Sequence, residues 1–341
     1  MKHIIGGGES PASGRAKLVQ VDEESAGQRL DNFLIRQLKG VPKTHVYRII
    51  RSGEVRVNKG RAGADRRVAA GDVIRLPPIR TSAAVAEKNE NPAPAREFPV
   101  LFEDEHLIAI DKPAGVAVHG GSGVSFGVIE QLRQARPGAR MLELVHRLDR
   151  ETSGILLVAK KRSALLKLQD QFRERETGKT YLALVAGVWP ANKKVIDLPL
   201  HKYLLADGER RVKVVSRDDP DGMRSITLVK VARSFSLPLP PREGGGERTF
   251  TLLEVTIKTG RTHQIRVHLA SAGHPIAGDD KYGDFELNKA LQRQGLKRMF
   301  LHAWRLQFDH PAGGERIELV AALPPELEKF AAHAVPASPP V

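Results

Sequence analysis

Short apolar segments separated by turns fill most of this chain and limit the folds open to it. Five of them, each four to seven residues long, are Leu107–Ile110, Ile155–Ala159, Tyr181–Val185, Leu252–Lys258 and Arg316–Val320. Apolar runs of this length between turn residues are typical of strands. Two helical patterns interrupt them, Val128–Ala135 and Ser163–Glu176, the second with Ser163 as its expected N-cap. This mixture predicts an α+β fold with a mainly antiparallel sheet and peripheral helices.

A smaller and strongly basic unit precedes this region. From Gly27 to Leu76 there are 12 Lys+Arg and 4 Asp+Glu, a net charge of +8 out of +14 for the whole chain. Helical spacing of apolar residues is found in Leu30–Leu38 and Val46–Ile50, and strand-like alternation in Val55–Val57 and Val73–Leu76. Two helices and a small sheet are therefore expected. Positive charge of this density predicts a polyanionic partner.

Nucleic acid fits that partner better than an anionic membrane. No apolar run approaches the roughly 20 residues needed to span a bilayer, and Met1–Gly14 lacks the apolar centre of a signal peptide. We therefore expect a cytosolic protein with no membrane contact. The absence of heptads and of long apolar edge strands favours a monomer.

The chain contains no cysteine, which excludes disulfides, thiol nucleophiles and thiolate zinc sites. Its 12 histidines are scattered along the sequence. His263 and His268 lie five residues apart, which is not the i,i+4 spacing of a helical zinc site. The sequence therefore predicts no metal site.

The run from His146 to Gly154, set between two apolar segments, places Asp149 in a loop with Arg147 and Arg150 on either side. Opposite charge within a few ångströms lowers the pKa of a carboxyl group and keeps it ionised. A nucleophile or general base needs that state. A surface loop whose acid only pairs with an arginine gives the same pattern, so this loop alone does not decide between the two interpretations.

Three other segments join polar groups to turns or strand ends. Asp111–Gly115, taken alone, predicts a turn with a solvated lysine. Lys179-Thr180-Tyr181 opens a strand, where the tyrosine either packs in the core or stacks on a nucleobase. Gly260–His268 crowds two arginines, two histidines and a glutamine into nine residues, which predicts a solvent-facing helix or a polar site. The Gly-rich loop His119–Gly123 lacks the Lys-Ser/Thr ending of a P-loop, which argues against nucleoside triphosphate binding.

One carboxylate, an arginine partner and a stacking aromatic on a basic protein fit the isomerisation of uridine. Uracil leaves C1′ of the ribose, turns until C5 faces the sugar and reattaches, and the C5 proton is then lost. Nothing is oxidised and no atom is gained, so no cofactor is required. The carboxylate either attacks C1′ or removes the C2′ proton, and the residues leave that choice open. A stacked base has to be flipped out first.

Four ordered segments resemble the motifs of the RluA-type RNA pseudouridine synthases. They are Lys112–Gly115, His146–Asp149 with Thr152–Gly154, Lys179–Tyr181, and Gly260–His268 with Gly273–Ile276 and Gly278-Asp279. The likeness covers about Phe98 to Leu323. The basic unit resembles an S4 RNA-binding domain through Arg29–Leu34 and Val46–Asn58. This unit and the loop His119–Gly127 are most similar to the RluC branch, which modifies large-subunit ribosomal RNA.

The resemblance implies an α+β protein with an N-terminal S4-like domain and a catalytic domain built on a mainly antiparallel mixed sheet. Together with the Gly- and Pro-rich composition of the connecting segments, it divides the chain into a disordered tail (1–20), the S4-like domain (21–77), a linker (78–97), the catalytic domain (98–330) and a second disordered tail (331–341). Ribosomal RNA is the implied partner. The Pro- and Gly-rich stretch Leu237–Arg248 departs from the family pattern and is expected to be a floppy excursion between two strands.

The resemblance also implies roles for single residues. Asp149 is the catalytic aspartate, Tyr181 stacks against the target base, and Arg266 pairs with the Asp149 carboxylate. Arg147 fills the gap left by the flipped uridine. His146, Arg261 and Gln264 are expected to contact the RNA backbone or to support the site. The RNA contacts expected in the S4-like unit are Arg29, Lys43, Arg48, Arg51 and Arg56.

Two other functions use the same features. A non-catalytic RNA-binding or ribosome-assembly factor needs only the basic unit, and it should tolerate loss of the Asp149 carboxylate. A glycosidase that releases uracil shares the first chemical step, and it should liberate free uracil.

Overall fold

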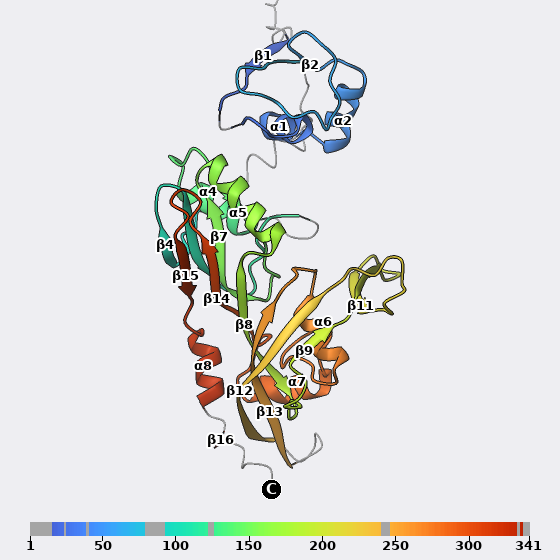
Figure 1. Ribbon diagram of the computed structural model, residues 1–341, viewed down its shortest axis with the longest axis vertical. Coiled ribbons are helices and arrows are strands. Elements are labelled where there is room, and N and C mark those ends of the chain that lie inside the picture. The colour runs from blue at the N-terminus through green and yellow to red at the C-terminus, as the bar shows by residue number, and fades with distance from the viewer. Residues whose placement is uncertain are drawn as a thin grey trace, which may run out of the picture. The chain divides into compact units, whose positions relative to one another are not determined.

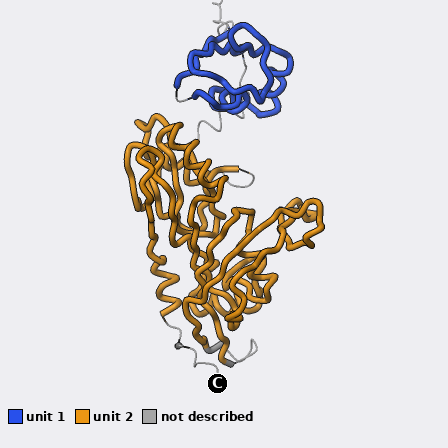
Figure 2. The backbone as a smooth tube through the Cα atoms, in the orientation of Figure 1, with its two compact units in different colours: residues 1–92 blue, residues 93–341 orange. Residues whose placement is uncertain are grey.

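The chain folds into two units, residues 1–92 and 93–341 (Figure 2). The computed structural model describes residues 16–23, 25–38, 41–78, 93–121, 126–239, 246–332 and 335–336. None of the helices among these residues is both long and apolar enough to cross a membrane.

The smaller unit combines two helices with a three-stranded antiparallel sheet. Its elements are α1 (Leu30–Gln37), α2 (Lys43–Arg51), β1 (Lys17–Gln20), β2 (Arg56–Val57) and β3 (Val73–Leu76), with the strands in the order β1-β3-β2. The apolar faces of both helices pack on the sheet in one core, which includes Phe33, Ile49 and Ile74. The predicted helices and the two predicted strands are confirmed.

The expectation that residues 1–20 are disordered is wrong for Lys17–Gln20. This segment forms β1 and pairs with β3 over its whole length, from Lys17 opposite Leu76 to Gln20 opposite Val73. Only Val19 of the four packs against the core, so the segment carries no alternating apolar signal of its own. Its strand conformation comes from the open edge of β3. Residues 1–15 lie outside the described residues.

The larger unit is built on one sheet of eleven described strands (Figure 1). They are β4 (Val100–Glu103), β5 (Leu107–Lys112), β6 (Glu143–Leu144), β7 (Ser153–Ala159), β8 (Gly178–Ala186), β9 (Val195–Asp197), β12 (Ile226–Leu239), β13 (Gly246–Ile257), β14 (Leu301–Asp309), β15 (Arg316–Val320) and β16 (Val335–Pro336). The main path is β16-β12-β13-β8-β14-β7-β5-β4. Among the described strand pairs, β7 and β14 alone run parallel. The expected mainly antiparallel mixed sheet is confirmed.

Five helices and a separate hairpin complete the described part of the larger unit. The helices are α4 (Val128–Ala135), α5 (Arg162–Glu174), α6 (Gln264–Ser271), α7 (Phe285–Arg293) and α8 (Pro325–Ala332), and the hairpin is β10 (Leu200–Leu204) with β11 (Arg210–Val214). The bounds predicted for α4 match residue for residue. Ser163 is not the N-cap of α5, because the helix begins one residue earlier, after Lys161. With helices around a mixed sheet, the fold is α+β.

Strand β7 is buried along its whole length because a helix covers each face of the sheet at this point. Ile155 and Leu157 pack with Leu168 of α5 in one cluster. Leu156 and Val158 pack with helix α4 in another. Successive side chains of a strand point to opposite faces, so a strand covered on both sides needs apolar residues at every position. This explains the continuous apolar run in the sequence.

The expectation of a floppy excursion at Leu237–Arg248 is wrong at both of its ends. Leu237–Leu239 and Gly246–Arg248 continue β12 and β13 as a paired antiparallel hairpin. Leu237 is buried in the cluster that holds Phe235 and Phe250, and burial of this alternating apolar face outweighs the turn signals of the prolines. Residues 240–245 lie outside the described residues.

The sheet holds the Asp149 loop at the start of β7. Gly154, the second residue of β7, has φ +109 and lies opposite Ala303 of β14. A Cβ at this position would overlap the carbonyl group of Ala303. The parallel pair therefore depends on a residue without a side chain, which is also free to adopt this backbone conformation.

Candidate active site

Asp149 lies in the loop between β6 and β7, and a buried lysine donates a hydrogen bond to the backbone of this loop. The Nζ of Lys112 donates hydrogen bonds to the carbonyl oxygens of Pro113, Val116 and Arg150, at 2.7, 2.8 and 3.1 Å. Lys112 is fully buried, and burial, together with the nearby Arg298, lowers its pKa to about 7. The expectation of a solvated lysine in this turn is wrong. Lys112 instead links the turn after β5 to the loop that carries Asp149.

Arg266, on the first turn of the buried helix α6, approaches Asp149 but binds another acid more closely. Its Nη1 lies 3.5 Å from Oδ2 of Asp149, which agrees with the expected pair. Its Nε and Nη2 donate to both carboxylate oxygens of Asp279 at 2.8 and 2.7 Å, and Nη2 also reaches Asp280 at 3.3 Å. Asp279 is therefore the main partner of the guanidinium, and Asp149 is a second one.

Burial disfavours the charged forms of Arg266 and Asp279, but the hydrogen bonds and the attraction between the two groups outweigh this effect. Burial alone lowers the pKa of Arg266, whereas the hydrogen bonds and charge of Asp279 raise it above its usual range. Burial raises the pKa of Asp279, and the guanidinium together with the backbone N–H groups of Lys281 and Tyr282 lowers it below its usual range. Both groups therefore stay charged at neutral pH, and Asp149 faces a fixed positive charge.

The neighbouring His263 also faces Asp149. Its Nε2 lies 3.9 Å from Oδ2 of Asp149, and its Nδ1 lies 2.8 Å from the hydroxyl oxygen of Tyr282. Burial lowers the pKa of His263, although the charge of Asp149 acts in the opposite direction. The ring is therefore neutral at neutral pH.

Tyr181, on β8, lies between two apolar clusters with its ring only partly buried. Burial raises the pKa of its hydroxyl group, and the charge of Asp149 adds to the effect. The phenol therefore stays protonated. Tyr181 lines the same pocket as Asp149, and its stacking on a base stays a prediction.

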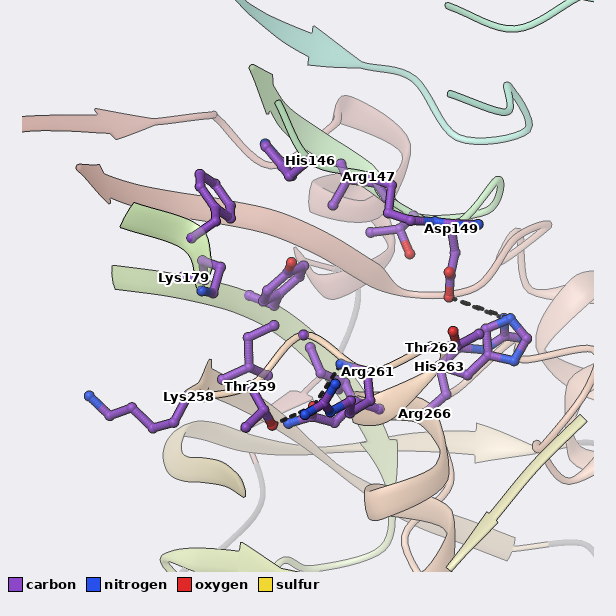
Figure 3. A pocket seen from close by; sticks show the side chains of 18 of the residues that line it. His146, Arg147, Asp149, Lys179, Lys258, Thr259, Arg261, Thr262, His263 and Arg266 are labelled. Atoms are coloured by element: carbon purple, nitrogen blue, oxygen red, sulfur yellow. Dashed lines mark hydrogen bonds and ion pairs between the residues drawn. The ribbon is translucent and has the colours of Figure 1, made fainter. Parts of the chain in front are cut away.

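These residues line a pocket of about 510 Å³ (Figure 3). Its walls are the Asp149 loop, the end of α5, the start of β8 and the segment from Ile257 to Arg266. All seven residues predicted for the catalytic region line it: His146, Arg147, Asp149, Tyr181, Arg261, Gln264 and Arg266. Of the described residues in the lining, Asp149 is the only acid, against seven arginines and lysines. Such a pocket attracts a polyanion and holds a single carboxylate within it.

His146 and Gln264 line the pocket, and their hydrogen bonds within the protein fit the supporting role, one of the two roles expected of them, whereas contact with RNA stays a prediction. The Nε2 of His146 accepts the N–H of Leu157, its ring stacks on Phe172, and burial lowers its pKa to about 4. The ring therefore offers no positive charge to a phosphate. Gln264 is buried, and its amide bonds Thr259, Thr227 and backbone groups at both ends. It supports the turn before α6.

Arg147 and Arg261 keep positions suited to RNA. Arg147 is exposed at the mouth of the pocket, and Arg261 is half-buried, with one weak bond of 3.4 Å to the carbonyl of Arg224. The neighbouring Lys179 is more enclosed. Burial, together with the charges of Lys258 and Arg175, lowers its pKa to about 8.

The RNA contacts predicted in the smaller unit lie mainly on the surface of α2. Lys43, Arg48 and Arg51 are exposed on this helix, and Arg56 is half-buried on β2. Arg29 is held by Asp31 at 2.7 Å, so part of its charge is already neutralised.

Sequence and structure comparisons identify the family. The sequence matches the RNA pseudouridylate synthase family over residues 106–271 and the S4 domain family over residues 28–74. Ribosomal large subunit pseudouridine synthase C of Pasteurella multocida (strain Pm70) is 49% identical over 321 residues, which are 92% of each chain. The protein of the same name from Yersinia pestis is 50% identical over 318 residues, 91% of this chain and 93% of that one. The chain belongs to the RluA family of RNA pseudouridine synthases.

Solved structures agree with this assignment. Human RNA Pseudouridylate Synthase Domain Containing 4 superposes with a TM-score of 0.53 at 28% identity, over 69% of this chain and 92% of that chain. This pseudouridine synthase therefore carries an S4 domain in its smaller unit and its catalytic fold in the larger one, and the predicted family is confirmed.

Three residues of the pseudouridine synthase site have no role among the sequence predictions. His263 and Asp279 occur there inside the motifs Gly260–His268 and Gly278-Asp279, and Tyr282 does not occur at all. The signal that could have found Asp279 is electrostatic. A buried arginine needs acceptors for all of its donors, and the Asp149 carboxylate contacts the Arg266 guanidinium through one oxygen only. A search for a second acid near α6 in the sequence would have reached Asp279.

One group of described residues outside the pocket has the geometry of a metal site. His201, Asp219 and Asp221 place three ligand atoms within 4.8 Å of one another, and they are partly or fully exposed. His201 lies on β10, Asp219 and Asp221 lie between β11 and β12, and none of the three lines the pocket.

Proposed function

We propose that this pseudouridine synthase isomerises uridines in large-subunit ribosomal RNA, with Asp149 as the catalytic carboxylate and no cofactor. The substrate follows from relatives of about 49% identity over 92% of the chain that are named for the large ribosomal subunit. The observation that carries the catalytic assignment is the position of Asp149, the single acid among the described residues that line a basic pocket, with a permanently charged guanidinium 3.5 Å away.

We assign tasks in nucleotide entry to Arg147 at the rim of the pocket and to Tyr181 in one wall. A uridine leaves its stack and enters the pocket, which costs a few kcal/mol of unstacking energy. Arg147, exposed at the mouth, occupies the gap that the uridine leaves. The ring of Tyr181 supports the base from one side, and the cations of the rim hold the neighbouring phosphates.

The chemical step conserves all atoms. The bond between N1 and C1′ breaks, uracil rotates, a bond forms between C5 and C1′, the C5 proton passes to solvent, and N1 takes up one proton in exchange. The Asp149 carboxylate acts on the sugar, either as a nucleophile at C1′ or as a base toward the C2′ proton. Arg266 orients that carboxylate in both cases, because it approaches Oδ2 from the pocket wall.

The test replaces Asp149 with Asn, which keeps the shape and removes the charge. Large-subunit ribosomal RNA transcribed without modifications is incubated with the full-length enzyme, and pseudouridines are mapped by carbodiimide-dependent primer-extension stops. We expect the variant to lose at least about 10²-fold in rate. The matched control is Glu151→Gln, which removes an acid of the same loop that pairs with Arg150 at 2.8 Å outside the pocket.

Three results would contradict the proposal. Unchanged stops with Asp149→Asn would show that the carboxylate is not catalytic. Free uracil in the product would indicate a glycosidase. Tight RNA binding by the wild-type enzyme without any stops would favour a binding factor or a different RNA substrate.

A further inference from the structure

His263 has a left-handed backbone conformation, which is uncommon for a residue with a Cβ. It precedes α6 with φ 51 and ψ 21, in the left-handed region. Of the described residues, only four that are not glycine have positive φ. Such a conformation costs free energy for a residue with a Cβ and is retained where the side chain is needed in one place. In Figure 3 the ring of His263 points toward the Asp149 carboxylate.

The contacts around His263 favour one of the two tautomers of its neutral ring. The hydroxyl oxygen of Tyr282 accepts the N–H of Val212 at 3.0 Å, so its own hydrogen is free for Nδ1 of His263, 2.8 Å away. With Nδ1 as the acceptor, a neutral ring carries its proton on Nε2. That N–H faces Oδ2 of Asp149. The opposite tautomer would turn a lone pair toward the carboxylate, which is repulsive.

Two donors therefore approach the same carboxylate oxygen from the protein side. Nη1 of Arg266 lies 3.5 Å and Nε2 of His263 lies 3.9 Å from Oδ2 of Asp149. In the part of the chain that the structure describes, neither carboxylate oxygen of Asp149 accepts a hydrogen bond, and the ion-pair contacts of both Arg266 and His263 are made to Oδ2. The fold distinguishes the two oxygens by these contacts before any substrate is bound.

We propose that His263, held by the Tyr282 hydroxyl, is a positioning residue that with Arg266 fixes Oδ2 of Asp149 and leaves Oδ1 as the oxygen that meets the ribose. This inference rests on the proposed function of Asp149. It deepens that function, because it assigns separate tasks to the two oxygens of one carboxylate. Displacement of a reacting group by about 1 Å can cost about 10²-fold in rate, so a weakened hold on Oδ2 is measurable.

The test uses two substitutions at the same position that make opposite predictions. In His263→Gln the amide nitrogen reaches the place of Nε2 and keeps a donor toward Asp149. In His263→Asn the amide nitrogen reaches only the place of Nδ1, so the donor toward Asp149 is lost. Asn is, however, the better residue for left-handed backbone. A positioning role therefore favours Gln, and a purely conformational role favours Asn.

The measurements are made with the full-length enzyme on unmodified large-subunit ribosomal RNA labelled with tritium at C5 of uridine. Tritium release under single-turnover conditions gives the rate constant, filter binding gives the RNA Kd, and thermal unfolding gives the Tm. We expect H263N to lower the rate constant at least about tenfold with Kd within about twofold of wild type, and H263Q to recover to within about threefold. Tyr282→Phe removes the hydroxyl that orients the ring, and it should lower the rate constant while leaving the RNA Kd unchanged.

Each outcome supports the inference or overturns it. A fast H263N and a slow H263Q would assign His263 to backbone geometry and overturn it, as would wild-type rates in both variants. If Asp149→Asn is inactive in the same assay while H263N is as fast as wild type, the proposed function stands and this inference falls. If the wild-type enzyme releases no tritium from this RNA, both fall.

Discussion

Replacing Asp279 with Asn should destabilise the larger unit more than any other removal of a single acid at the site. Asp279 is fully buried, receives two hydrogen bonds from Arg266 at 2.7 and 2.8 Å, and accepts two backbone N–H groups. The Asn variant keeps the shape but leaves the buried guanidinium without its main counter-charge.

The size of the effect follows from Coulomb's law. With charge centres about 4 Å apart and an effective dielectric constant of about 20, the attraction is about 4 kcal/mol. Breaking a buried pair by removing one partner typically costs about 3–5 kcal/mol, which agrees with this value. The matched control is Asp280→Asn. Asp280 lies 3.3 Å from the same guanidinium, but its side chain is 71% exposed, so the loss should stay below about 1 kcal/mol.

Urea unfolding followed by tryptophan fluorescence measures this effect in the full-length chain. The sequence has two tryptophans, Trp189 and Trp304, and both lie in the larger unit, so the signal reports the unfolding of that unit. At pH 7 we expect Asp279→Asn to lower the free energy of unfolding by about 3–4 kcal/mol and Asp280→Asn to leave it nearly unchanged. Equal losses in the two variants would refute the argument that burial determines the contribution of this ion pair.

Three further predictions concern other parts of the molecule. Replacing Arg48 and Arg51 with Gln should reduce the log–log salt slope of RNA affinity by about 0.7 for each lost phosphate contact, as measured by filter binding, and an unchanged slope would exclude these contacts. Burial lowers the pKa of His302 to about 4, while the unfolded chain takes up this proton below about pH 6.5, so stability falls as the pH drops through this window. At pH 5 the His302 contribution lowers the free energy of unfolding by about 2 kcal/mol. Urea unfolding of His302→Gln should therefore show a decrease in stability from pH 7 to pH 5 that is about 2 kcal/mol smaller than in the wild type. Lys112→Met leaves three carbonyl groups without their donor, so it should lower the free energy of unfolding in urea by about 3 kcal/mol and slow tritium release. A wild-type rate of tritium release would show that the Asp149 loop does not need this support.

The sequence predicted the elements whose signals are local. The bounds of α4 follow from apolar spacing within the helix, and the pairing of apolar segments into one sheet follows from their length and turns. Strand β1 was missed because its conformation is imposed by β3 rather than by its own residues. The paired ends of β12 and β13 were missed because long-range burial of Leu237 outweighs a local signal from proline.

The predicted site residues gather in one pocket, but several of their contacts could not be read from the chain. Arg266 was expected to pair with Asp149, yet Asp279, 13 residues along the chain, takes both of its closest hydrogen bonds. Which acid meets a buried arginine depends on where two turns meet in space. The neutral state of His146 likewise depends on Phe172 and Leu157, which the fold brings to it from other elements.

The parallel contact at Gly154 makes the Asp149 loop sensitive to a residue that does not line the pocket. A methyl group at position 154 would push β7 away from β14. It would also displace the preceding five residues, including Asp149, from their positions relative to Arg266. We therefore expect such a variant to be nearly inactive. Inactivating substitutions in this enzyme are therefore expected in the sheet as well as around the reacting groups.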